Sequence, residues 1–127
     1  MSVTKISKTK IKVLIVDDHP VVRKGLLSCL AGKENLKIVG EAANGHEAIR
    51  LVKELAPDIV LMDMDMPEMD GLEATAVIRT QERQRGVHTP IIAMTAHAMK
   101  GDRQRCLDAG MDDYLSKPIR AGELFEK

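Results

Sequence analysis

Acidic residues stand directly after two apolar segments of this sequence. Asp17 and Asp18 follow the run IKVLIV, and Asp63 follows the run IVLM. Two carboxylates ~4 Å apart repel each other by about 1 kcal/mol in water and by about 4 kcal/mol at an intermediate dielectric constant. Three clustered carboxylates therefore either raise a pKa or bind a cation, and a site with only oxygen ligands favours Mg²⁺ or Mn²⁺ over Zn²⁺. Chemistry at a carboxylate beside a divalent metal ion is the first hypothesis.

A hydroxyl and an ammonium group occupy similar positions later in the sequence. Thr95 follows the run IIAM, and Lys117 follows the run YLS. Thr95 could instead cap a helix, and the Lys117-Pro118 step could be a plain turn. These structural interpretations weaken if both side chains lie at the edge that holds the three carboxylates, because the five groups then form one polar site. The other acidic pair, Asp112-Asp113, precedes an apolar run and is expected to be a solvated turn.

The hydrophobic pattern predicts strands and helices in alternation. Apolar runs without polar alternation are typical of parallel strands buried on both faces, whereas apolar residues at a spacing of three or four indicate helices. Asn44 is a predicted helix cap. We predict strands over 11–16, 36–40, 58–62, 90–94 and 114–115, and helices over 20–32, 46–55, 72–84 and 119–127, with another helix through Met99, Cys106 and Leu107 that ends near Gly110.

This order of elements predicts an α/β fold, a doubly wound five-stranded parallel sheet with helices on both faces and right-handed crossovers. In such sheets, ligands bind outside the carboxyl ends of the strands. The three acids, Thr95 and Lys117 all follow predicted strands. The predicted fold therefore places its polar site at that edge.

Length and composition indicate one globular domain of 127 residues with 44% hydrophobic and 30% charged residues. Lys plus Arg and Asp plus Glu balance at 19 each, so neither nucleic acid nor a membrane is an expected partner. No run approaches the ~18 apolar residues of a membrane span, and residues 1–10 lack the apolar core of a signal peptide. We expect a cytoplasmic protein with a flexible tail over 1–10, although a basic interaction arm there is an open alternative.

Four strings resemble one known family. IKVLIVDDHP, IVLMDMDMPEMDGLEA, IIAMTAHAM and YLSKPI are similar, in order and spacing, to the receiver domain of two-component response regulators. The resemblance runs from about Lys10 to Lys127 and implies a flavodoxin-like receiver domain over 11–127. The predicted last helix is short, so the sequence leaves open whether the domain ends there or was cut from a longer protein.

The resemblance also implies site residues. Asp63 would be the phosphoryl acceptor, in a site that binds Mg²⁺ or Mn²⁺. Asp18 and Asp63 would bind the metal directly, Asp17 through water, and Asp65 through its backbone carbonyl. An extra carboxylate at Asp65, two residues past the acceptor, is a departure that could alter metal affinity or hydrolysis, or could point to solvent.

Further roles follow from the same resemblance. Thr95 and Lys117 would bind phosphoryl oxygens, and Tyr114 would rotate with Thr95 as a switch that alters the face of the fourth predicted helix and the fifth strand. The donor would be a phosphohistidine of a sensor histidine kinase or a histidine phosphotransfer protein. Such a domain promotes its own phosphorylation and dephosphorylation and is not otherwise an enzyme. It regulates an attached effector domain, a homodimer or another partner.

The two halves of the chain resemble different receivers. Residues 17–56 are similar to receivers attached to helix-turn-helix domains, whereas the chain from MPEMDGLEA onward is more similar to receivers of hybrid histidine kinases. This difference is compatible with ordinary family variation and with a chain assembled from two parents. It leaves the downstream partner open.

Other protein functions fit the sequence less well, and the histidines are not expected to be ligands. A haloacid-dehalogenase-like phosphatase is the main alternative, since Asp63 and Asp65 form an Asp-x-Asp motif, but in that family this motif comes first and the metal-binding acids come late. A dinucleotide-binding domain is disfavoured because the sequence has no glycine-rich turn after the first predicted strand. A DNA-binding domain is disfavoured because no helix-turn-helix follows the predicted sheet. Surface or loop positions are predicted for four histidines: His19, His46, His88 and His97. His97, two residues after Thr95, borders the predicted site, and a contact with the phosphoryl donor is an open alternative for it.

Overall fold

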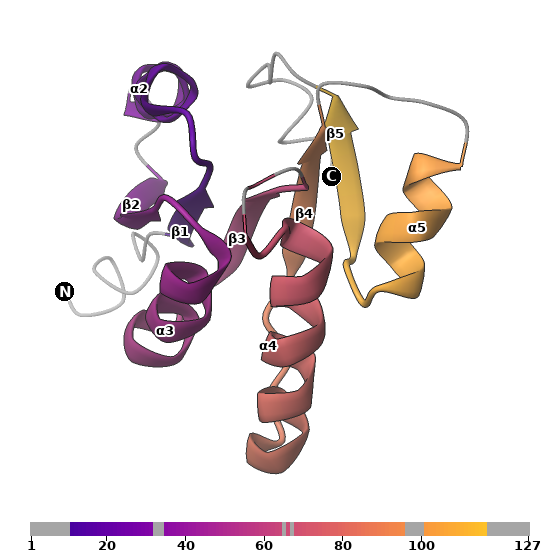
Figure 1. Ribbon diagram of the computed structural model, residues 1–127. Helices are drawn as coiled ribbons and strands as arrows, with labels where there is room; N and C mark the ends of the chain where they lie inside the picture. The colour runs from indigo at the N-terminus through magenta and orange to yellow at the C-terminus, as the bar shows by residue number, and fades with distance from the viewer. Residues whose placement is uncertain (1–10, 32–34, 65, 67, 96–100, 117–127) are drawn as a thin grey trace, which may run out of the picture.

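The computed structural model describes residues 11–31, 35–64, 66, 68–95 and 101–116 (Figure 1). The predicted tail over 1–10 and the predicted last helix over 119–127 lie outside these ranges. Within them, no helix is long and apolar enough to cross a membrane. The described elements, in chain order, are β1 (Ile11–Val16), α2 (Pro20–Ala31), β2 (Leu36–Ala42), α3 (Gly45–Leu55), β3 (Ile59–Asp63), α4 (Gly71–Arg85), β4 (Ile91–Thr95), α5 (Asp102–Asp108) and β5 (Asp113–Ser116).

The strands form one parallel sheet in the order β2-β1-β3-β4-β5. The chain leaves β1 to form β2 on one side and then returns to form β3 on the other side of β1. The register of β1 and β3 pairs Val16 with Met62, the residues just before Asp17 and Asp63. This order confirms the predicted doubly wound fold and places the first two acidic strand ends side by side.

Helices cover both faces of the sheet, as predicted (Figure 1). Leu14 and Val16 of β1 join one core cluster, to which α3, α4 and α5 also contribute buried residues. Val13 and Ile15 point to the other face and share a second cluster with Leu26 and Leu30 of α2. Alternate residues of a strand face opposite sides, so the unbroken apolar run of β1 supplies both cores.

Most element boundaries lie within one residue of the prediction, and two differ by more. β2 continues past Gly40 to Ala42, because Gly40 pairs with Leu14 of β1 and does not end the strand. A Cβ atom on Gly40 would stand 2.9 Å from Cδ1 of Leu55, so the glycine allows α3 to pack closely. The helix predicted through Met99 and Cys106 begins at Asp102, and Met99 is outside the described residues.

Side-chain caps define the start of two helices. The Asn44 side chain accepts a 2.9 Å hydrogen bond from the backbone N–H of Glu47, which confirms the predicted cap of α3. Asp70 and Glu73 form a reciprocal capping box at the start of α4. Each cap satisfies donors that the first turn of a helix leaves unpaired, so the loop after β3 ends at a well-defined residue.

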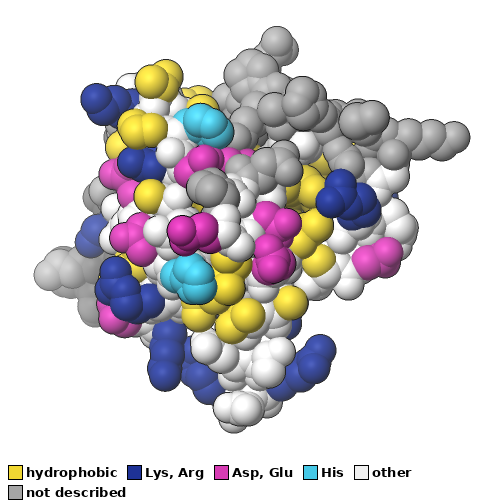
Figure 2. All heavy atoms as spheres, in the orientation of Figure 1, with side chains coloured by type: hydrophobic (Ala, Val, Ile, Leu, Met, Phe, Trp, Pro, Cys, Tyr) yellow, Lys and Arg dark blue, Asp and Glu magenta, His cyan; other side chains and the backbone are white. Residues whose placement is uncertain are grey.

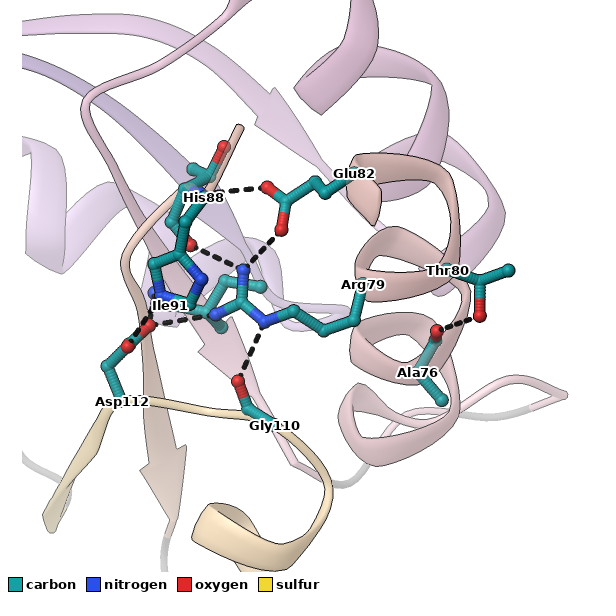
Figure 3. A network of polar contacts seen from close by, with 9 residues as sticks. Ala76, Arg79, Thr80, Glu82, His88, Ile91, Gly110 and Asp112 are labelled. Atoms are coloured by element: carbon teal, nitrogen blue, oxygen red, sulfur yellow. Dashed lines mark hydrogen bonds and ion pairs between the residues drawn. The ribbon is translucent and has the colours of Figure 1, made fainter. Parts of the chain in front are cut away.

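Arg79 anchors α4 to the amino ends of β4 and β5 (Figure 3). Its guanidinium donates at 2.8 Å to the carbonyl oxygens of Gly110 and Thr89. It also forms ion pairs at 2.6 Å with Glu82 and 2.8 Å with Asp112. Asp112 accepts the backbone N–H of Ile91 as well. Asp112 is therefore a structural anchor, which the prediction of a solvated turn missed.

The Glu82 carboxyl is buried beside this guanidinium, and its surroundings shift its titration. Burial alone would raise the pKa of Glu82, but hydrogen bonds from Arg79 and Thr89 and the charge of Arg79 outweigh burial and hold the pKa below its ordinary value. A lowered folded-state pKa stabilises the protein above the unfolded-state pKa, and this contribution is lost as pH falls through the folded-state value.

We therefore expect Glu82→Gln to weaken the pH dependence of stability. Wild-type protein should lose free energy of unfolding as pH falls from the unfolded-state pKa of Glu82 through its lowered folded-state pKa, and the variant should lose less over the same interval. Urea unfolding between neutral and acidic pH measures both curves. Parallel curves for the two proteins would contradict this assignment.

Candidate functional site

Four side chains meet where β1 and β3 end. Asp17 and Asp63 are almost fully buried, with 0% and 2% of their surface exposed, while Asp18 and His19 are more open. One potential ligand atom from each of the four residues lies within 4.8 Å of the others. The structure thus brings together all three acids that the sequence singled out and adds a histidine.

The electrostatics of this cluster suit a cation. Several acidic side chains lie across the middle of the face seen in Figure 2, and many Lys and Arg side chains lie toward its lower and left edges. Oδ1 of Asp18 is buried but has no hydrogen-bond partner of suitable geometry among the described residues. A buried carboxylate oxygen without such a partner is costly unless a cation or water satisfies it. The residues present therefore fit a hard divalent metal ion.

The loop after Asp63 is held close to the strand by backbone contacts. The N–H of Met64 donates to Met94 at 3.1 Å, and the N–H of Gly71 donates to Met64 at 3.0 Å. Gly71 lies so close that a Cβ atom there would stand 2.2 Å from the carbonyl oxygen of Asp63. A glycine at the start of α4 is thus required for the observed position of Asp63.

Thr95 and Tyr114 lie on the same face of the sheet. Thr95 ends β4 and is 2% exposed, one position beyond Met94, which pairs with Asp63. Tyr114 of β5 pairs with Ala93 and packs against the core cluster on the α3, α4 and α5 side. Since Ala93 and Thr95 are two residues apart on one strand, Thr95 and Tyr114 are diagonal neighbours.

Two predicted site residues lie outside the described part of the chain. Lys117 follows Ser116, whose backbone pairs with Thr95 at the end of β5. Asp65 follows Met64 in the loop after β3. Their predicted roles stay predictions.

A sulfur contact connects the residue that follows β3 to α5. Sγ of Cys106 lies 3.4 Å from Sδ of Met64, and both side chains are buried. Cys29 and Cys106, both within the described ranges, are free thiols. The residue next to Asp63 is thereby in direct contact with the helix beside β5.

Sequence reasoning missed two residues beside the acids. His19 was expected at the surface, and its side chain is indeed 61% exposed, but its Nδ1 lies 3.0 Å from carboxylate oxygens of both Asp17 and Asp18. Arg23 donates from Nη1 to the backbone carbonyl of Asp17 and from Nε to Glu41 at 3.2 Å. The position of His19 directly after the acidic pair was the available signal.

Comparisons with known proteins identify the family. A model of the response regulator receiver domain matches residues 13–127. The histidine kinase BarA of Shigella flexneri is 41% identical over 98% of this chain. The response regulator VraR of Staphylococcus epidermidis is 40% identical over 91% of this chain. The chain spans only 13% of that kinase and 54% of that regulator.

A solved structure has the same fold. The receiver domain of the sensor histidine kinase PA1611 from Pseudomonas aeruginosa superposes with a TM-score of 0.79 at 39% identity, with 93% of each chain covered. Likeness to a kinase and to a response regulator agrees with the predicted resemblance to both kinds of receiver. This chain belongs to the response regulator receiver domain family and is a signalling domain of two-component phosphorelay systems.

Proposed function

We propose that this domain accepts a phosphoryl group on Asp63 from a phosphohistidine, with Mg²⁺ or Mn²⁺ held beside it. The adjacency of β1 and β3, which gathers Asp17, Asp18 and Asp63 at one edge of the sheet, carries the proposal. The PA1611 receiver domain, similar over 93% of its length, has a magnesium ion coordinated in its active site cleft. Asp18 and Asp63 would bind the metal directly, Asp17 through water, and Asp65 through its backbone carbonyl.

Asp63 is the nucleophile in this proposal. A carboxylate oxygen attacks the phosphorus, the bond from phosphorus to the donor nitrogen breaks, and the donor imidazole keeps that electron pair and takes up a proton. The metal, when bound, supplies positive charge that offsets the charge of the phosphoryl oxygens. Thr95 and Lys117 would bind those oxygens from the adjoining strand ends, and the same groups would assist hydrolysis of the product.

The output would begin at Thr95. A phosphoryl group adds charge and acceptor oxygens at Asp63, which can draw the Thr95 hydroxyl inward and free space for Tyr114 to turn. The face formed by α5 and β5 would change, because Tyr114 belongs to β5 and packs in the core that α5 shares. Output is then a population shift toward a state that an effector domain, a second copy or another partner recognises.

The physiological context follows from this chemistry. The donor would be a sensor histidine kinase or a histidine phosphotransfer protein, which would place the exchange in the cytoplasm, where ATP supplies the phosphoryl group. Residues 11–127 would form the receiver domain, since β1 begins at Ile11, and residues 1–10 would be a tail outside it.

Phosphorylation by a small-molecule donor tests the proposal. With Mg²⁺ and acetyl phosphate, wild-type protein should gain one labile phosphoryl adduct by intact mass, and Asp63→Asn should gain none, because an amide cannot act as the nucleophile. Asp108→Asn, at an exposed acid of α5 whose side chain accepts a hydrogen bond from Gln104, is the matched control and should be labelled normally. An unlabelled wild type, or equal labelling of Asp63→Asn, would overturn the proposal, whereas turnover of a phosphate ester would favour the phosphatase alternative.

A further inference from the structure

The imidazole of His19 occupies a position that none of the roles above uses. Its Nδ1 lies 3.0 Å from Oδ1 of Asp17 and 3.0 Å from Oδ1 of Asp18. Its backbone N–H donates to the same Asp17 oxygen at 2.9 Å. The ring is therefore held against both acids that follow β1.

The two 3.0 Å contacts of Nδ1 match the spacing of neighbouring ligands around one small cation. Neighbouring ligands of an octahedral ion with bonds of about 2.1 Å stand about 3.0 Å apart, and opposite ligands stand about 4.2 Å apart. The potential ligand atoms of Asp17, Asp18, His19 and Asp63 all lie within 4.8 Å of one another, so a contraction of about 0.6 Å at most would bring them within the octahedral limit. A nitrogen donor is thus available in the same shell as the carboxylates.

An imidazole changes which metal such a shell prefers. Mg²⁺ favours carboxylate, carbonyl and water oxygens, whereas later divalent metals such as Co²⁺ bind imidazole readily and generally bind mixed N/O sites more tightly. The side chain of His19 is 61% exposed, so the ring can adjust to a bound ion without disturbing the core.

We propose that His19 is a specificity-determining ligand of the metal site, which makes this receiver bind transition-metal ions such as Co²⁺ in preference to Mg²⁺. The inference rests on the proposed function only in that the acids after β1 and β3 hold a divalent ion. Nδ1 would exchange its contacts with the two carboxylates for a bond to the ion that they share. The acids alone predict a site with only oxygen ligands. That ligand set would apply to bound Mg²⁺, whereas a bound transition-metal ion would also have the imidazole nitrogen as a ligand.

Calorimetric titration of the whole chain with Co²⁺ and separately with Mg²⁺ tests this inference. His19→Asn removes the imidazole but keeps a short side chain that can donate to the acids. Its Co²⁺ affinity should fall at least about tenfold, while its Mg²⁺ affinity should change less than about threefold. The visible absorption of bound Co²⁺ should also shift, since nitrogen leaves the ligand shell. His46→Asn, at an exposed position of α3, is the matched control and should change neither affinity.

The outcomes separate the two proposals. Loss of Co²⁺ affinity alone in His19→Asn supports the role of His19. An unchanged Co²⁺ affinity and spectrum, or an equal loss for both metals, overturns that role, and the second result makes His19 an orienting residue for the acids. If Asp63→Asn also weakens Mg²⁺ binding, the proposed metal site stands regardless of His19. If wild type binds neither ion, both the metal site and the role of His19 are wrong.

Discussion

Replacing Gly71 by alanine should lower both the stability of the domain and the rate at which Asp63 is phosphorylated. The added Cβ would stand 2.2 Å from the Asp63 carbonyl oxygen and 3.0 Å from Cγ of Met62. The oxygen contact must lengthen by about 0.8 Å to reach even 3.0 Å. We expect a loss of about 2–3 kcal/mol in the free energy of unfolding, as for other overpacked sites.

Phosphorylation should suffer more than stability because the clash falls on the acceptor residue itself. A displacement near 1 Å at reacting groups can cost about 100-fold in rate, and we expect a decrease of that order. Moving α4 away would relieve the clash, but it would also disturb the hydrogen bond from Gly71 to Met64 and the capping box at Asp70. Urea unfolding and a time course of labelling by acetyl phosphate measure the two effects.

Gly25→Ala is the matched control for this substitution. Gly25 lies inside α2 and is exposed, and a Cβ atom added there would meet no other atom within 4 Å. Alanine there should raise the free energy of unfolding by about 0.5–1 kcal/mol and leave labelling unchanged. Equal behaviour of the Gly25 and Gly71 variants would mean that the close approach to Asp63 does not constrain the site.

Arg79→Met should cause a large loss of stability although Arg79 lies outside the acidic site. Methionine keeps much of the alkyl volume but removes the guanidinium that pairs with Glu82 and Asp112 and donates to Gly110 and Thr89. The Glu82 carboxylate, whose side chain is 4% exposed, would remain buried without its cation. Removing one partner of a buried ion pair costs about 3–5 kcal/mol, a large share of the ~5–15 kcal/mol of a typical domain.

Arg50→Met provides the comparison at an exposed pair. Arg50 and Glu54 form an ion pair at 3.1 Å along α3 with both side chains more than half exposed, and such pairs contribute only about 0.3–0.5 kcal/mol. Urea unfolding of both variants measures the difference. Similar small losses for Arg79→Met and Arg50→Met would show that the anchor seen in Figure 3 contributes little.

A double-variant cycle separates the ion pair from the other contacts of Arg79. Glu82→Gln should destabilise wild-type protein but should be neutral or stabilising when Arg79 is already methionine, because the buried negative charge then has no cation. The coupling between the two substitutions should reach about 1–3 kcal/mol. Additive losses would instead assign the effect to the backbone carbonyls that Arg79 binds.

The sequence alone was sufficient to predict the strands, the cap at Asn44 and the identity of the acids. Unbroken apolar runs such as 11–16 and 59–62 are local signals, since a parallel strand buried on both faces needs apolar side chains at every position. Asn44 as a cap is equally local, because it bonds a backbone group three residues away. Strand alternation with helices also predicted that polar residues after the strands share one edge of the sheet.

Tertiary structure decided which of those residues meet and which other groups join them. The order β2-β1-β3 sets Asp17 beside Asp63, 46 positions later in the sequence, and packing rather than local spacing selects that neighbour. The close approach of Gly71 to Asp63 and the bonds of Arg79 to Asp112 depend in the same way on how α4 docks. His19 was visible in the sequence, but its ring position depends on rotamers and loop geometry, which only the folded chain determines.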